Sequence, residues 1–296
     1  MFRLSLALSA LALTALLSAS PAGAATAPID PALSQTVTAD ETIAAPGTPV
    51  VISAGHVDLG PLMEPGLDLL ARDDTAHPPV WRHLDDVVLH VPDTAAQELP
   101  AGEEFAFTGA SPGEQVWVVP QTEVPGVPWL GWNTQSPALT QAADRGVTYE
   151  FAGHRGPGQF SLFLQNGGFE PPQQLWNSSA EGTQPFWVEL NTHTHANWVF
   201  TEPGIHQVAV TVTVPLLDAT SPTITRVLTF AVGEDIDLDQ AQATEWEGEF
   251  RQVDGVVEGD VAKQATASFW WVLAAGILLC VALAIAGFTL RRRGER

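Results

Sequence analysis

The central part of the chain alternates apolar and polar residues over short runs that are separated by proline, glycine and aspartate. Because successive side chains of a strand point to opposite faces, this period of two predicts strands that each bury one face. The runs with this pattern are residues 87–91, 147–151, 160–164, 208–214 and 223–232, and further strands are expected at 116–119 and 186–190. Residues 218–222 are expected to turn the chain between the last two strands of the first group.

No window between Ala25 and Glu234 keeps an apolar stripe of helical period and helical length. Short strands that are divided by frequent turn residues are typical of all-β domains. The pattern therefore predicts an antiparallel β-sandwich of the Ig-like kind over residues 50–233, preceded by an N-terminal extension over residues 25–49.

Both ends of the chain carry targeting signals. Arg3, the apolar run 4–17 and the Ala22-Gly23-Ala24 cleavage pattern are typical of a signal peptide, so residues 1–24 are expected to be removed. Residues 269–290 hold no charge, are long enough to cross a bilayer core of roughly 30 Å, and precede a basic tail over residues 291–296. The pattern predicts a cell-membrane protein that crosses once and carries its β-domain outside.

Residues 234–268 are acidic and poor in large apolar side chains. This composition indicates a stalk between the β-domain and the membrane, with a short helix at residues 237–247.

Charge and cysteine content narrow the classes of function. The chain has 12 basic and 34 acidic residues. Seven of the basic and 33 of the acidic residues lie between Ala25 and Ser268, so this segment has a net charge of about −26. Such a surface repels nucleic acid and attracts cations, although it is also a common device for solubility. The single cysteine, Cys280, falls in the predicted membrane span, which excludes cysteine-based zinc motifs and thiol nucleophiles from the β-domain.

Two short patterns that contain histidine supply the candidate metal ligands of this sequence. His193 and His195 are two residues apart, as are His56 and Asp58, so in strands each pair projects to one side. Together they form a three-histidine, one-aspartate set that suits a divalent metal such as zinc, manganese or iron. The alternative is that both pairs are ordinary strand residues that stay apart, because short motifs of this kind arise by chance. Asn197 is a candidate ligand-binding neighbour, and His154 the next candidate.

Five motifs lie in order along residues 50–232: Gly55-His56-Val57-Asp58, Val116-Trp117-Val118-Val119-Pro120-Gln121-Thr122, Leu130-Gly131-Trp132-Asn133-Thr134, Gly156-Pro157-Gly158-Gln159-Phe160 and His193-Thr194-His195-Ala196-Asn197-Trp198. In this order they resemble actinobacterial surface-anchored proteins of the choice-of-anchor M domain family. The resemblance implies display on the cell surface and a link to components of metal-uptake ABC transporters. It implies no established biochemical activity.

The tryptophans support a second hypothesis. Trp129 and Trp132 are expected in a loop, where exposed indoles would form a binding surface for sugar rings or an adhesion partner, while Trp117 and Trp198 are expected in the core. A third reading makes the domain a structural spacer on the surface. The usual hydrolase, metalloprotease and phosphate-loop motifs do not occur in the sequence, so we expect binding and not catalysis.

Overall fold

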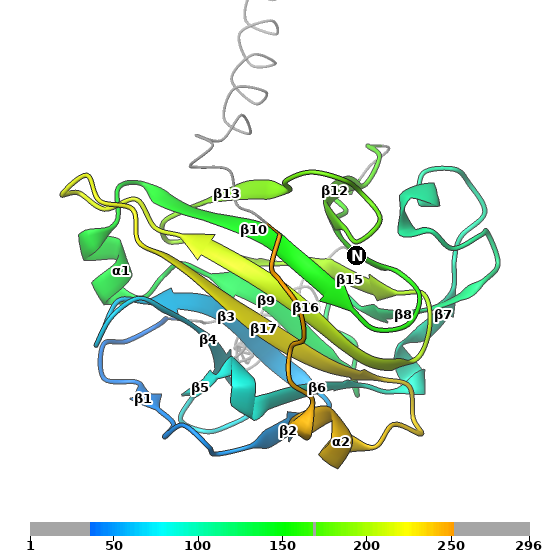
Figure 1. Cartoon of the computed structure of the whole chain (residues 1–296), viewed down its shortest axis with the longest axis horizontal. Helices are drawn as coiled ribbons and strands as arrows, with labels where there is room; N and C mark the ends of the chain where they lie inside the picture. Colours follow the sequence, from blue (N-terminus) through cyan, green and yellow to red (C-terminus); the bar gives the residue numbers. More distant parts are fainter. Residues whose placement is uncertain (1–35, 168–169, 252–296) are drawn as a thin grey trace, which may run out of the picture. The chain divides into compact units, whose positions relative to one another are not determined.

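Strands make up most of the regular structure in residues 36–167 and 170–251, the part of the chain that the computed structural model describes. Figure 1 shows the long strands β10, β16 and β17 side by side. The strands form three sheets, which we call A, B and C. The helices are short, with α1 at Pro137–Ala142, α2 at Leu238–Ala243 and 3-10 turns at Leu84–Asp86, Asp93–Ala95 and Ala106–Thr108. The predicted all-β class is confirmed.

Each sheet has a simple strand order. Sheet A contains, in order, β1 (Thr42–Ile43), β5 (Val80–His83), β4 (Asp68–Asp73), β3 (Gly55–Leu62), β9 (Pro128–Asn133) and β14 (His193–His195). Sheet B contains β13 (Pro185–Glu189), β10 (Gly146–Arg155), β16 (Gly204–Thr213), β17 (Thr223–Val232), β6 (Val87–Val91) and β2 (Val50–Ile52). Sheet C contains β12 (Gln173–Asn177), β11 (Phe160–Leu164), β15 (Asn197–Phe200), β8 (Gln115–Val119) and β7 (Ala96–Glu98).

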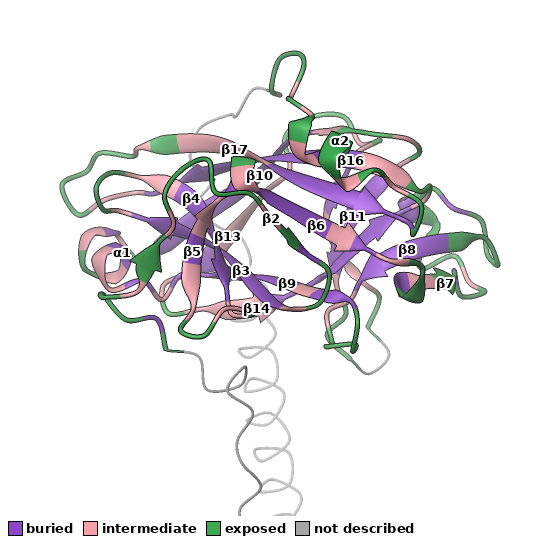
Figure 2. Ribbon diagram, turned by 90° about the horizontal axis from the view of Figure 1, so that it is seen from below, coloured by how far each residue is buried: buried purple, intermediate pink, exposed green. Residues whose placement is uncertain are grey.

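One hydrophobic core joins the three sheets as a sandwich. Tyr149 of sheet B packs near Trp132 of sheet A, and Phe230 of sheet B packs against Trp198 of sheet C. Sheet B is therefore one layer, and sheets A and C share the other. In Figure 2 the strands of both layers are largely in the buried colour, while many of the connecting loops are exposed.

The architecture differs from the predicted antiparallel, Ig-like sandwich in two ways. Parallel pairs join β3 to β9, β6 to both β2 and β17, and β1 to β5. There are also three sheets in place of two, because the segment 193–200 leaves sheet A after His195 and enters sheet C at Asn197. Ala196, at the corner, is fully buried. Strands that switch sheets at a corner are a known way to build such packings, and alternation of residues does not reveal them.

Several strands bury both faces, where the alternation predicts one. On sheet C, Val118, Phe163 and Val199 pack with Leu99 and Phe105 in a second cluster on the side away from the main core. The segment that follows β7 covers this face. The extra cover explains why apolar residues stand at positions that the period-two pattern assigns to solvent.

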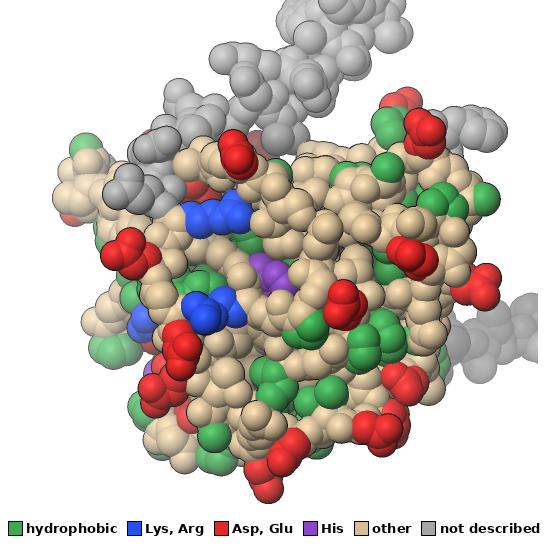
Figure 3. All heavy atoms as spheres, turned by 45° about the vertical axis from the view of Figure 1, so that its right-hand side comes forward, with side chains coloured by type: hydrophobic (Ala, Val, Ile, Leu, Met, Phe, Trp, Pro, Cys, Tyr) green, Lys and Arg blue, Asp and Glu red, His purple; other side chains and the backbone are tan. Residues whose placement is uncertain are grey.

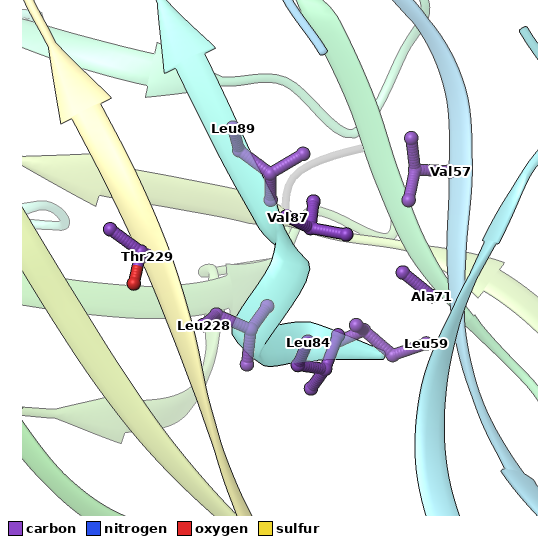
Figure 4. Close-up of a pocket in the computed structure, with 8 residues that line it drawn as sticks. All are labelled: Val57, Leu59, Ala71, Leu84, Val87, Leu89, Leu228 and Thr229. Carbon is purple, nitrogen blue, oxygen red and sulfur yellow. The ribbon is translucent and has the colours of Figure 1, made fainter. Parts of the chain in front are cut away.

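The main core is closely packed. A cavity of about 10 Å³ lies between sheets A and B, and Figure 4 shows the residues that line it, which are Val57, Leu59, Ala71, Leu84, Val87, Leu89, Leu228 and Thr229. This space is about the size needed for one water molecule, and only one lining side chain is polar. This cavity is therefore part of the structural core.

The folded domain extends beyond the predicted limits at both ends. Val37 packs with Trp81, and β1 lies in the predicted extension. Ala241 of α2 packs against Val88, and the Arg251 N–H donates to Ala152, so residues 238–251 belong to the domain where a stalk is expected. The signal peptide (1–24), the rest of the predicted stalk, the span (269–290) and the tail lie outside the described residues. Within residues 36–167 and 170–251, no helix has the length and apolar character needed to cross a membrane.

Candidate metal centre

The two histidine-containing pairs come from two strands of sheet A that are separated by one strand. β9 pairs in parallel with β3 and antiparallel with β14, and Gly131 of β9 lies opposite both Asp58 and His195. Neighbouring strands are about 4.8 Å apart, so the two pairs must reach toward each other across β9. They can do so because residue 131 has no side chain. A Cβ there would stand 2.9 Å from Asp58 Oδ1 and 2.9 Å from His195 Cε1.

The four predicted ligands converge. The three Nε2 atoms of His56, His193 and His195 lie 3.0–3.1 Å from one another. Asp58 Oδ1 lies 3.1 Å from His193 Nε2, 3.4 Å from His56 Nε2 and 3.9 Å from His195 Nε2. We call these four atoms the cage. The expectation that the two pairs form one group that could hold a metal ion is confirmed.

Hydrogen bonds alone cannot satisfy the cage. Each neutral imidazole Nε2 either donates a proton or accepts one. In a triangle of three such atoms, at least one pair must be two donors or two acceptors in repulsive contact. A cation at the centre removes this conflict, because all three nitrogens and the carboxylate oxygen can direct lone pairs at it. The donor set of three imidazoles and one carboxylate is one that zinc and related metals accept.

The protonation states favour metal binding. Burial lowers the pKa of His195 to about 3, so this ring is neutral at physiological pH. Burial by itself raises the pKa of Asp58, but the hydrogen bond with His193 and the charges of the imidazoles outweigh it, and the pKa lies below its ordinary value. His195 thus offers a neutral imidazole and Asp58 an ionised carboxylate, which are the forms that bind metal.

A chain of ion pairs supports His56 from behind. His56 Nδ1 lies 2.7 Å from Asp74 Oδ2, which orients the ring so that Nε2 faces the cage. Asp74 in turn accepts from Arg72 at 2.6 Å, and Arg72 forms a two-pronged contact with Glu41 at 2.7 and 2.8 Å. Arg72 is 4% exposed, so these contacts are shielded from solvent. Sequence reasoning missed this support, since Asp74, Arg72 and Glu41 form no motif with the histidines.

Two further residues of β9 border the cage. Trp129 stacks on His195 with ring centroids 3.9 Å apart and packs edge-on against His56. Asn133 donates from Nδ2 to Asp58 Oδ2 at 3.1 Å. Both lie two residues from Gly131 and so share its face of the sheet. That spacing is the signal that could have identified them.

The proposed tryptophan surface is not found. Residues 128–133 form strand β9 and not a loop, and Trp132 points into the core with 4% exposure. Trp129 is half-buried against the cage, and its Nε1 donates to Gln121 O. Trp117 and Trp198 are buried, as expected.

Asn197 lies outside the cage. Its Oδ1 accepts from the Gln121 N–H at 3.0 Å, so it holds the segment that also binds the Trp129 indole. Its side chain borders a separate cavity of about 140 Å³ on sheet C, together with Leu99, Phe105 and Val199. Asn197 begins β15 of sheet C, whereas His193 and His195 lie on β14 of sheet A, so its role as a ligand-binding neighbour stays a prediction.

His154 also lies apart from the cage. Its Nε2 stands 3.0 Å from Nδ1 of His206, whose Nε2 donates to Glu202 O at 3.0 Å. His206 is fully buried. Burial lowers the pKa of His154 to about 3 and that of His206 to about 4. The pair is a neutral hydrogen-bonded unit within sheet B.

The β-domain as a whole is acidic. The only basic residues between positions 36 and 251 are arginines, and those nearest the cage are already paired with carboxylates. Figure 3 shows one face on which Asp and Glu side chains are spread widely and Arg side chains are few. An acidic field of this kind raises the local concentration of cations.

Comparison with protein-family models, with curated proteins and with solved structures finds no match to this chain. The resemblance to surface-anchored proteins of the choice-of-anchor M family therefore stays a prediction. The geometry of the cage is the firmest basis for a function.

Proposed function

We propose that this protein is a surface-anchored extracellular binding protein that takes up a divalent metal ion in the cage of His56, Asp58, His193 and His195. The observation that carries the proposal is the mutual approach of four potential ligand atoms from two distant segments. Nothing in the packing of the core demands that three imidazoles meet there, since the cage lies on the face of sheet A opposite Val57, Leu130 and Trp132.

We assign binding and not catalysis to the cage. All four ligands are protein side chains, while Gly131 and Trp129 leave little space beside them. Catalytic zinc sites instead keep one position open for water or substrate. The predicted signal peptide and membrane span would place the cage outside the cell, and the family resemblance favours delivery of the metal to components of an ABC transporter.

Metal analysis by mass spectrometry tests the binding. The full chain, purified in a mild detergent without a histidine tag, is expected to carry close to one equivalent of metal after incubation with zinc and gel filtration. A His193→Ala/His195→Ala variant should lose it. The matched control is His83→Ala/His90→Ala, which also removes two histidines, both of them partly exposed and outside the cage, and should retain the metal. Equal metal content in all three proteins, or none in the wild type, would overturn the proposal.

Anchoring and transport need a separate measurement. Protease added to intact cells should remove the β-domain, while a tag placed after Arg296 stays protected. Deletion of the gene should lower metal accumulation under metal limitation, and the His193→Ala/His195→Ala variant should fail to restore it. Restoration by that variant would separate the surface location from any role of the cage.

A further inference from the structure

We infer that the metal is zinc, held by four ligands, and that Asn133 sets this preference by restricting Asp58 to one coordinating oxygen. This inference rests on the proposed function, because it assumes that the cage binds a metal at all. It goes further by assigning the coordination number, and with it the ion.

Asp58 has one oxygen available. Its Oδ1 faces the three imidazoles, while its Oδ2 accepts from Asn133 Nδ2 at 3.1 Å. The orientation of the Asn133 amide is settled by the backbone, since Asn133 Oδ1 accepts from the Gln135 N–H at 2.7 Å. The Nδ2 group must then point at Asp58. Because Asp58 is fully buried and Asn133 is 1% exposed, solvent does not compete for this bond.

The size of the cage matches zinc. The six distances between the four atoms define one point that is equally far from all of them, at about 2.0 Å, which is the length of zinc bonds to imidazole nitrogen and carboxylate oxygen. The tetrahedron is distorted, with its widest edge at 3.9 Å between Asp58 and His195. A calcium ion, whose ligands stand at 2.3–2.6 Å, needs a wider site.

The surroundings limit additional ligands. An added Cβ at Gly131 would come within 2.5 Å of Thr194 O, so the sheet closes one side of the cage. The Trp129 ring closes another by stacking on His195. His193 is the most open ligand, with 22% of its side chain exposed, and marks the side from which an ion can enter. Octahedral ions such as manganese need six ligands, and the cage supplies four with Asp58 held to one oxygen.

Cobalt(II) reports coordination number directly, because four-coordinate cobalt absorbs visible light far more strongly than six-coordinate cobalt. The full chain in detergent, stripped with a chelator and titrated with cobalt(II) alone, should develop intense visible bands that zinc then abolishes. Competition of zinc against manganese(II), followed by metal analysis, should leave zinc bound. Weak bands, or manganese retained as well as zinc, would overturn this inference while leaving metal binding intact. Failure to bind any metal would overturn the proposed function instead.

Asn133→Ala tests the positioning role. Freeing Asp58 Oδ2 should weaken the cobalt bands and lower the preference for zinc over manganese. The affinity for zinc itself should fall by about 10- to 100-fold, the range seen when outer hydrogen-bond partners of metal ligands are removed. Gln135→Ala is the control, since the Gln135 side chain accepts from Asn133 without touching Asp58. An unchanged spectrum and preference in a folded Asn133→Ala protein would show that Asn133 is only structural.

Discussion

Removal of the metal should lower the thermal stability of the β-domain by a calculable amount. An ion that binds only the folded cage contributes RT ln(1 + [L]/Kd), which is about 2.7 kcal/mol at a free concentration of 100 times Kd. For a domain of 150–250 residues, 1 kcal/mol shifts the midpoint by about 2–4 °C. We therefore expect the midpoint to fall by roughly 5–10 °C on chelation.

The cage also explains why the effect should not be smaller. Without a cation, the buried Asp58 carboxylate and three mutually contacting imidazole nitrogens remain in place, and at least one of their contacts is repulsive. Without the ion, the folded state therefore loses the attraction between the ligands and the cation but keeps the repulsion between the ligand atoms.

Calorimetry of the full chain in detergent measures this shift, with free zinc buffered at 100 times the Kd found by chelator competition. The His193→Ala/His195→Ala variant should show no dependence on zinc, and the His83→Ala/His90→Ala control should behave as the wild type. Midpoints that agree within about 1 °C with and without bound zinc would refute the argument, because they would mean that the ion binds the unfolded chain equally well.

Three further predictions address single contacts. Asp74→Asn should weaken metal binding by about 10- to 100-fold in a chelator titration, because it removes the charge that faces His56 Nδ1; unchanged affinity would contradict this. Gly131→Ala should lose the metal and about 1–3 kcal/mol of stability in urea, whereas Gly66→Ala, with open space around its Cβ, should do neither. Acid should destabilise the fold through His206, because its pKa of about 4 in the folded state lies below the value of 6.5 in the unfolded chain. The contribution of neutral His206 to the free energy of unfolding is fully present above pH 6.5 and falls by about 3 kcal/mol toward pH 4. A His154→Gln/His206→Gln variant should show a shallower loss between pH 6.5 and 4, and parallel curves would count against this assignment.

Several of the strands were predictable from the sequence, and the sheet order was not. Alternation identified β10, β11, β16 and β17 because their inner residues face one apolar core. Alternation within a strand carries no information about its partner, so the parallel insertion of β9 beside β3 could not be read from it. The corner at Ala196 was equally hidden, since residues 193–200 look like one strand in sequence and serve two sheets.

The candidate metal site could also be predicted only in part. The spacing of His193 and His195 predicted that both rings share a face, and the structure agrees. Whether that face meets His56 depended on strand order, which is a long-range property. The tryptophan prediction failed for a local reason: Trp129 and Trp132 are an odd number of residues apart in one strand, so they point to opposite faces and cannot form one exposed patch.

The alternation of side chains along β9 also explains why the cage needs this strand between the two ligand pairs. Trp129, Gly131 and Asn133 alternate with the core residues Leu130 and Trp132, so β9 sends large side chains into the sandwich and presents to the cage a ring, a gap and an amide. Each of the three residues has a separate role in the site. Gly131, which has no side chain, lets the ligands from β3 and β14 approach each other. The Trp129 ring covers His195, and the Asn133 amide donates to the second oxygen of Asp58. A shift of β9 by one residue would exchange the two faces and place Leu130 and Trp132 among the ligands. The register of one strand therefore links the stability of the core to the geometry of the metal site.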